Sequence, residues 1–140
     1  MTIISVEKKS LGAELGFQLA DKIEAIDGSR VNDIIDYRFK VSDDRIRIKV
    51  RQSGELVEYD LEKDLDDDLG LEFEDMRIRK CANDCVFCFV DQNPEGMRSG
   101  MYFRDGDFRM SFLHGHYITL TNMGWKELKR VVEQRLTPLY

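Results

Sequence analysis

The first half of the chain alternates short stretches of period-two hydrophobicity with glycine turns. Residues 45–51 read Arg-Ile-Arg-Ile-Lys-Val-Arg, the pattern of a strand with one buried and one solvated face. Ser53-Gly54 then predicts a turn into a partner strand. The predicted elements are strands over 3–6, 21–26, 45–51 and 56–61, and helices over 10–17 and from a cap at Asn32 or Asp33 to about residue 40. Residues 1–74 therefore predict a small α+β domain.

Residues 75–140 follow a different pattern. We expect a short strand over 76–80, a polar loop over 91–107, a β-branched strand over 117–121 and a helix over 123–135. Thr121 or Asn122 is the predicted helix cap, and Leu139-Tyr140 begins a further strand. The apolar stripe of the helix comprises Trp125, Leu128, Val131, Val132 and Leu136.

The order strand, loop, strand, helix, strand is the beginning of an α/β repeat. A parallel sheet of this kind needs several more units. We therefore expect residues 75–140 to form the first α/β units of an incomplete barrel, and the chain to be an N-terminal piece of a longer protein.

Composition and charge exclude several classes of function. The net charge of −6 argues against a general grip on nucleic acid, which needs a cationic surface. No apolar run approaches the roughly 20 residues of a membrane span, so no membrane association is expected. The N-terminus lacks the basic flank and apolar core of a signal peptide. We expect a cytoplasmic protein whose thiols stay reduced.

The candidate chemistry lies in three cysteines. Cys81, Cys85 and Cys88 are the only cysteines of the chain and fall within eight positions. An odd number of clustered cysteines in a reducing compartment favours metal ligation over a disulfide. Iron–sulfur clusters are held by cysteine thiolates, typically four. Three ligands from one loop would leave one iron of a four-iron cluster open to a substrate or cofactor.

Two other readings of the cysteines stay open. The three thiols with His114 or His116 would form a Cys3His structural zinc site. Cys85 and Cys88 alone have the spacing of a redox pair. His114 and His116 are spaced by one residue on a predicted strand, so their side chains would point the same way.

The first half resembles a bacterial PDZ domain. The resemblance rests on the segments Leu11-Gly12-Ala13-Glu14-Leu15-Gly16-Phe17, Asp21-Lys22-Ile23 through Asp27-Gly28, and Val31. It implies binding of a peptide as an added strand, with loop amides taking the terminal carboxylate. Leu69-Gly70-Leu71-Glu72-Phe73 has the character of that loop, in an order that suits a circularly permuted domain. Leu69, Gly70, Leu71 and Phe73 are therefore the predicted peptide-binding residues.

The second half is similar to the radical S-adenosylmethionine superfamily, with Phe87 immediately before the last cysteine. Residues 85–94, 101–109 and 111–122 resemble a bacterial family of iron–sulfur oxidoreductases. Its members have an N-terminal PDZ-like domain, a radical S-adenosylmethionine-like barrel and a C-terminal domain of unknown function.

This resemblance implies that Cys81, Cys85 and Cys88 hold a 4Fe-4S cluster and that S-adenosylmethionine binds to it. Thr121 or Asn122 would contact the cofactor, and a protein such as ferredoxin or flavodoxin would supply electrons. Arg104 and Arg109 could offset the charge of a cluster or cofactor, but solvated pairing with Asp105 and Asp107 is favoured. The remaining alternative is a PDZ-like adaptor fragment without catalysis.

Overall fold

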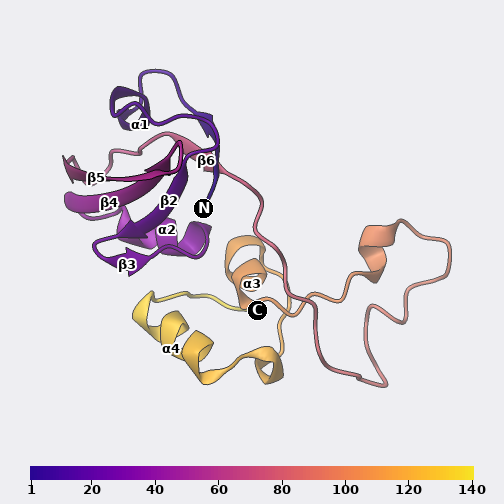
Figure 1. The fold of residues 1–140 in the computed structure, drawn as a ribbon. Helices are drawn as coiled ribbons and strands as arrows, with labels where there is room; N and C mark the ends of the chain where they lie inside the picture. The colour runs from indigo at the N-terminus through magenta and orange to yellow at the C-terminus, as the bar shows by residue number, and fades with distance from the viewer. The chain divides into compact units, whose positions relative to one another are not determined.

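The computed structural model describes residues 1–140, which divide into two compact units, Met1–Met76 and Arg77–Tyr140 (Figure 1). The two units are described separately. None of the helices is long and apolar enough to cross a membrane.

The first unit is an α+β domain with two antiparallel sheets, as the hydrophobic pattern predicts. One sheet has the strand order β3-β2-β4-β5, and the other pairs β1 with β6. The elements are β1 (Ile3–Val6), α1 (Leu11–Glu14), β2 (Lys22–Ile26), β3 (Ser29–Arg30), α2 (Ile34–Lys40), β4 (Arg45–Gln52), β5 (Glu55–Glu62) and β6 (Leu71–Phe73).

Turn and cap residues define these elements locally. Ser53 and Gly54 have φ values of +48° and +93°, the left-handed conformation of a tight hairpin turn between β4 and β5. Asp33 caps α2, where its Oδ1 accepts hydrogen bonds from the amides of Ile35 at 3.2 Å and Asp36 at 3.1 Å. The predicted hairpin and the predicted start of α2 are therefore confirmed.

The core of this unit lies against the inner face of β4. Ile46, Ile48 and Val50 are buried and alternate with exposed or half-buried basic residues along the strand. Ile23 and Ile26 of β2 complete the same apolar layer at 0 % exposure. Burial of one face fixes the register of β4 and β5, because a slip by one residue would turn every isoleucine to solvent.

The β1–β6 sheet joins the two ends of the unit. Val6 pairs with Leu71 and Ile3 with Phe73, so the last strand of the unit lies beside its first. Leu69, just before β6, is fully buried in the core.

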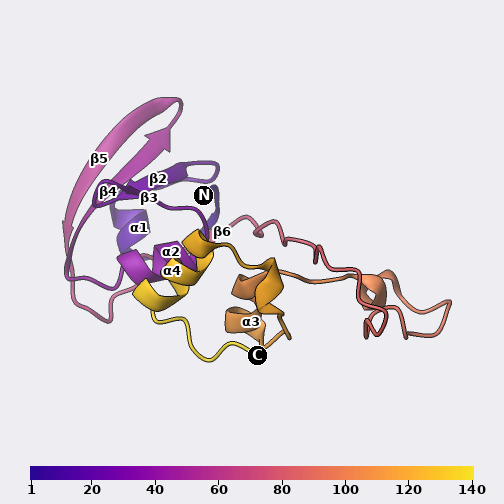
Figure 2. The ribbon, with the colours of Figure 1, turned by 90° about the horizontal axis from the view of Figure 1, so that it is seen from below.

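The second unit contains helices and turns but no β-strand. Its elements are the 3-10 turn η1 (Ser99–Tyr102), α3 (Phe108–His114), the 3-10 turn η2 (Leu120–Asn122) and α4 (Trp125–Glu133) (Figures 1 and 2). The predicted strand over 117–121 is wrong, and that over 76–80 is reduced to one isolated bridge between Lys80 and Asp105. Strand propensity alone does not form a ladder when no partner strand lies alongside. The parallel α/β units are accordingly not formed among residues 77–140.

Helix α3 is absent from the sequence-based prediction, which left its residues between a loop and a strand. Asp107 caps it, and Gly115 ends it with a φ of +71°. His114 is therefore the last residue of a helix, and the strand predicted to carry His114 and His116 does not exist.

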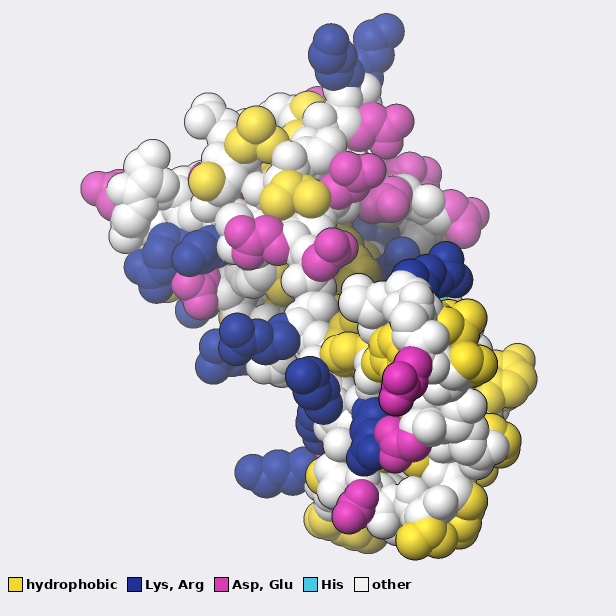
Figure 3. Space-filling model, turned by 90° about the vertical axis from the view of Figure 1, so that its right-hand side faces the viewer, with side chains coloured by type: hydrophobic (Ala, Val, Ile, Leu, Met, Phe, Trp, Pro, Cys, Tyr) yellow, Lys and Arg dark blue, Asp and Glu magenta, His cyan; other side chains and the backbone are white.

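Helix α4 confirms the predicted helix but not its predicted cap. Its N-cap is Gly124, whose amide donates to Glu127 Oε2 at 2.7 Å. Thr121 and Asn122 lie in η2. Its predicted apolar stripe is only partly buried: Leu136, beyond its end, is 4 % exposed, whereas Trp125 and Val132 are 80 % and 76 % exposed. In the space-filling view of Figure 3, hydrophobic side chains gather in the lower part of the picture.

Candidate metal centre

The three cysteines lie in a long loop that is closed by a short stem. The stem consists of residues 79–81 beside residues 104–106. Cys81 N donates to Arg104 O at 2.8 Å, and Gly106 N donates to Arg79 O at 3.1 Å. A side chain at Gly106 would place its Cβ 2.6 Å from Cys81 Cα and 2.8 Å from Cys81 N. Only glycine permits this close approach, which fixes the backbone of the first cysteine.

A buried ion pair anchors the stem to α3. The Asp107 carboxylate is 2 % exposed and accepts from Arg109 Nε at 2.8 Å, while Arg109 donates to Arg77 O at 2.8 Å. Asp107 also accepts from the amide of Arg79 at 3.0 Å. Burial opposes ionisation of Asp107, but the hydrogen bonds from Arg109 and Arg79 outweigh it and lower the pKa of this carboxyl group. The stem therefore depends on a charged Asp107.

Arg104 joins the two sides of the cysteine loop. Its guanidinium donates to Asn83 O at 3.4 Å on one side and forms a two-pronged ion pair with Asp91 on the other, with Nε 3.2 Å from Asp91 Oδ1. Hydrogen bonding and charge from Asp91, followed by the charges of Cys88 and Asp84, raise the pKa of Arg104. A permanent cation thus lies close to the last cysteine.

The expected pairing of Arg104 with Asp105 or Asp107 is wrong. Asp105 instead binds His116, with Nδ1 2.7 Å from Oδ2, while Arg109 does pair with Asp107 as predicted. Arg104 and Asp105 are adjacent in sequence, yet each pairs with a more distant residue, Arg104 with Asp91 and Asp105 with His116.

The turn η2 contacts the residues that directly follow Cys81. Asn122 Oδ1 accepts from Ala82 N at 2.9 Å, and Asn122 Nδ2 donates to Cys81 Sγ at 3.2 Å. Thr121 Oγ1 accepts from Asn83 Nδ2 at 2.8 Å. The structure therefore brings the two predicted cofactor-binding residues, Thr121 and Asn122, against the first part of the cysteine loop.

The donor chemistry of the loop fits a thiolate-bound metal. All three cysteines are free; Cys85 is exposed and the other two are half-buried. Val86, Phe87 and Phe89 beside them are 100 %, 70 % and 80 % exposed, an apolar rim that remains uncovered. No three His, Cys, Asp or Glu side chains converge on one point in a metal-binding group. The fit therefore rests on the donors and their spacing, and not on a preformed cage.

Neither the Cys3His zinc site nor a Cys85–Cys88 redox pair is preformed in the structure. His116 is bound to Asp105, and neither histidine joins the cysteines in a metal-binding group. Cys85 and Cys88 span a turn, with Cys88 N donating to Cys85 O at 3.1 Å, and no helix begins there as in thioredoxin-like redox pairs.

The predicted peptide-binding residues occupy the β6 region of the first unit. Gly70 O accepts from Glu7 N and Glu74 N donates to Thr2 O, the residues on either side of β1. Alternation therefore directs the backbone groups of Leu71 and Phe73 to the outer edge of β6. No second strand pairs with this edge. The Gly70 amide is already used, because it donates to Asp68 Oδ1 at 3.1 Å.

A buried hydroxyl group lies beside this strand. The ring of Phe73 packs edge-on against Tyr37 of α2, with 4.6 Å between ring centroids. Tyr37 is 3 % exposed, and its hydroxyl has no hydrogen-bond partner. Burial, followed by the charge of Asp68, raises the pKa of Tyr37. Buried hydroxyl groups almost always have a hydrogen-bond partner, so Tyr37 is an exception in this core.

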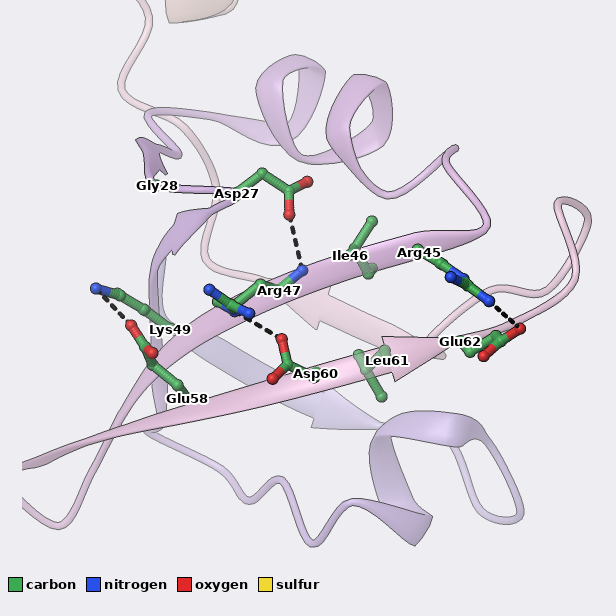
Figure 4. A pocket seen from close by; sticks show the side chains of 10 residues that line it. All are labelled: Asp27, Gly28, Arg45, Ile46, Arg47, Lys49, Glu58, Asp60, Leu61 and Glu62. Carbon is green, nitrogen blue, oxygen red and sulfur yellow. Dashed lines mark hydrogen bonds and ion pairs between the residues drawn. The ribbon is translucent and has the colours of Figure 1, made fainter.

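A hollow on the outer face of β4 and β5 offers no comparable chemistry (Figure 4). Its charged side chains pair across the strands, as Arg45 with Glu62 at 3.1 Å, Arg47 with Asp60 at 2.6 Å and Lys49 with Glu58 at 2.5 Å. This ladder of exposed pairs explains the alternating charges of the hairpin without a ligand.

Comparison with known proteins adds two matches. A family model described as a Radical SAM-like domain matches residues 63–140, more than half of the chain and including all three cysteines. A PDZ domain model matches residues 2–52. No curated protein matches the chain.

The sequence-based prediction missed the residues that hold the loop. Arg104 was assigned to the wrong partner, and the contact between Asn122 and Cys81 joins residues 41 positions apart. A glycine after the Arg104-Asp105 pair was the available signal for the stem, because a close backbone approach is a common reason for glycine outside turns.

Proposed function

Because this chain belongs to the radical SAM-like domain family, we propose that it holds a 4Fe-4S cluster on Cys81, Cys85 and Cys88. The observation that carries the proposal is that every cysteine of the chain lies in one eight-residue stretch inside the matched region. When bound, such a cluster would offer an open iron to S-adenosylmethionine and supply the electron for its reductive cleavage.

The surrounding residues support this assignment. Gly106 and Asn122 hold Cys81, and Arg104 provides a cation to offset the negative charge that three thiolates bring together. The exposed apolar rim of Val86, Phe87 and Phe89 would keep water from a cluster once it is covered. We place the protein in the cytoplasm, where thiols stay reduced, and expect a ferredoxin or flavodoxin as reductant.

Anaerobic reconstitution with iron and sulfide tests the proposal. We expect a brown protein with broad visible absorption, which Cys85→Ala abolishes. The matched control is Glu95→Ala, an exposed residue of the same loop whose carboxylate has no partner, and it should retain full iron content. Stoichiometric zinc in a colourless, anaerobically purified protein would instead establish the Cys3His or another zinc site.

The outer edge of β6 favours a second function, peptide binding by strand addition. Leu71 and Phe73 direct their backbone groups away from β1, so an extended peptide can pair there. Asp68 occupies the Gly70 amide, so we infer that the site accepts internal segments and does not require a terminal carboxylate. Leu69 supports β6 from the core.

Selection from random peptides displayed with free or blocked C-termini tests whether the site requires a terminal carboxylate. We expect blocked and free peptides to be recovered alike by the native protein. Asp68→Ala removes the acceptor that occupies the Gly70 amide, so free carboxylates should be enriched in this variant. Exclusive recovery of free C-termini by the native protein would refute the inference.

A further inference from the structure

The side chain of Asn122 is fixed at both ends of its amide group. Its oxygen accepts from Ala82 N at 2.9 Å, and its nitrogen donates to Cys81 Sγ at 3.2 Å. The opposite assignment of oxygen and nitrogen would place the NH2 group against the N–H of Ala82, with two donors facing each other. The amide therefore has one orientation, with its N–H directed at the sulfur.

Neighbouring contacts keep η2 against the loop. Thr121 Oγ1 exchanges hydrogen bonds with the Asn83 amide at 2.8 and 3.2 Å and lies 3.1 Å from Thr119 Oγ1. These contacts hold the residue before Asn122 against the residue after Ala82. The orientation of the Asn122 side chain is therefore supported by two elements and not by its own rotamer alone.

The contact also distinguishes Cys81 from the other two cysteines. Cys81 alone receives a hydrogen bond on its sulfur from a side chain, and its backbone is held by Arg104 and Gly106. Cys85 is exposed, and the only bond that joins it to Cys88 is a backbone turn. The three ligands are thus chemically and sterically unequal.

We propose that Asn122 is a positioning residue that orients Cys81 as the first ligand and raises the reduction potential of the metal centre through its hydrogen bond to the sulfur. The inference rests on the proposed cluster function. A donor on a ligating sulfur stabilises the more negative, reduced state, and hydrogen bonds to sulfur are among the determinants of cluster potential. It gives Asn122 a role toward Cys81 in place of direct contact with S-adenosylmethionine.

The contact itself can be tested in the metal-free protein by NMR. Cys81→Ala removes the acceptor, so the side-chain NH2 resonances of Asn122 should move, whereas Cys85→Ala should leave them in place. Unchanged resonances in Cys81→Ala, or equal shifts in both variants, would overturn the proposal. This readout does not depend on a bound cluster.

The effect on potential is tested by two matched substitutions in the reconstituted protein. Asn122→Asp keeps the oxygen that accepts from Ala82 and removes the N–H donor. Ala82→Asp adds the same charge beside Cys81 at an exposed position and keeps the backbone N–H that Asn122 accepts from. We expect the potential to fall further in Asn122→Asp than in Ala82→Asp. Cluster assembly in Ala82→Asp but not in Asn122→Asp would also support positioning.

Equal falls in potential would show a simple charge effect and refute the tuning role. If the native protein assembles no cluster, the proposed function fails and the tuning role with it. The NMR experiment would then still decide whether Asn122 binds Cys81.

Discussion

Replacing Gly106 with alanine should displace Cys81 and impair metal binding. The added Cβ would lie 2.6 Å from Cys81 Cα, 2.8 Å from Cys81 N and 3.1 Å from Lys80 C. All three atoms belong to the backbone, so no side chain can rotate away, and the stem must open by about 1 Å to restore ordinary contact. A displacement of about 1 Å at a functional site is enough to cause large losses.

The cost follows from the contacts that this opening breaks. Two backbone hydrogen bonds cross the stem, from Cys81 to Arg104 and from Gly106 to Arg79, each worth about 1 kcal/mol. Overpacking adds about 1–3 kcal/mol. We therefore expect the free energy of unfolding to fall by about 3–5 kcal/mol.

Denaturant unfolding and iron content after anaerobic reconstitution are the measurements. Gly100→Ala is the matched control, because Gly100 lies in the same loop with no atom within 4 Å of an added Cβ and no positive φ. It should change stability by less than about 0.5 kcal/mol and retain its iron. If Gly106→Ala matched this control in both measurements, the stem would not position Cys81.

Three further predictions concern charge and burial. Asp107 is held ionised below its ordinary pKa of 3.8, so its stabilisation is present above that pH and is lost as the pH falls through the lowered value. Asp107→Asn should remove this acid dependence and, by weakening the bond to Arg109, lower stability by about 2 kcal/mol in pH-dependent unfolding; unchanged acid unfolding would contradict it. Tyr37→Phe should leave stability unchanged or raise it by about 1 kcal/mol in thermal unfolding, because it removes an unpartnered buried hydroxyl; a loss beyond about 1 kcal/mol would reveal a hidden partner. Arg104→Gln should accelerate loss of iron to a chelator, whereas the exposed Arg98→Gln should not; equal rates would exclude a role for this cation.

The strands of the first unit were predictable because their signals are local. The alternation in β4 and the turn at Ser53-Gly54 depend on neighbours in sequence, and burial of Ile46, Ile48 and Val50 then fixes the register. The pairing of β6 with β1 joins segments far apart in the chain, and no local pattern predicted it.

The second unit was predicted less well because its signals are ambiguous or distant. Residues 117–121 have strand propensity but no partner strand, and η2 forms at their end instead. Helix α3 is short and its single polar cap at Asp107 was read as part of a loop. The cysteines form a visible cluster in the sequence, and Asn122 was predicted as a cofactor contact. The pairing of Arg104 with Asp91 and the contact of Asn122 with Cys81 were not predicted, because hydrogen bonds between distant residues leave no periodic pattern.

The three cysteines are held to different degrees, and under the proposed cluster function this difference would couple metal binding to ordering of the loop. Cys81 is fixed by the stem and by Asn122, whereas Cys85 is exposed and no metal-binding group is preformed. Under the proposed cluster function, binding at Cys85 and Cys88 would order part of the loop, and the conformational entropy lost there would reduce the net affinity. Arg104 limits this loss, because its bonds to Asn83 and Asp91 already hold the two sides of the loop together.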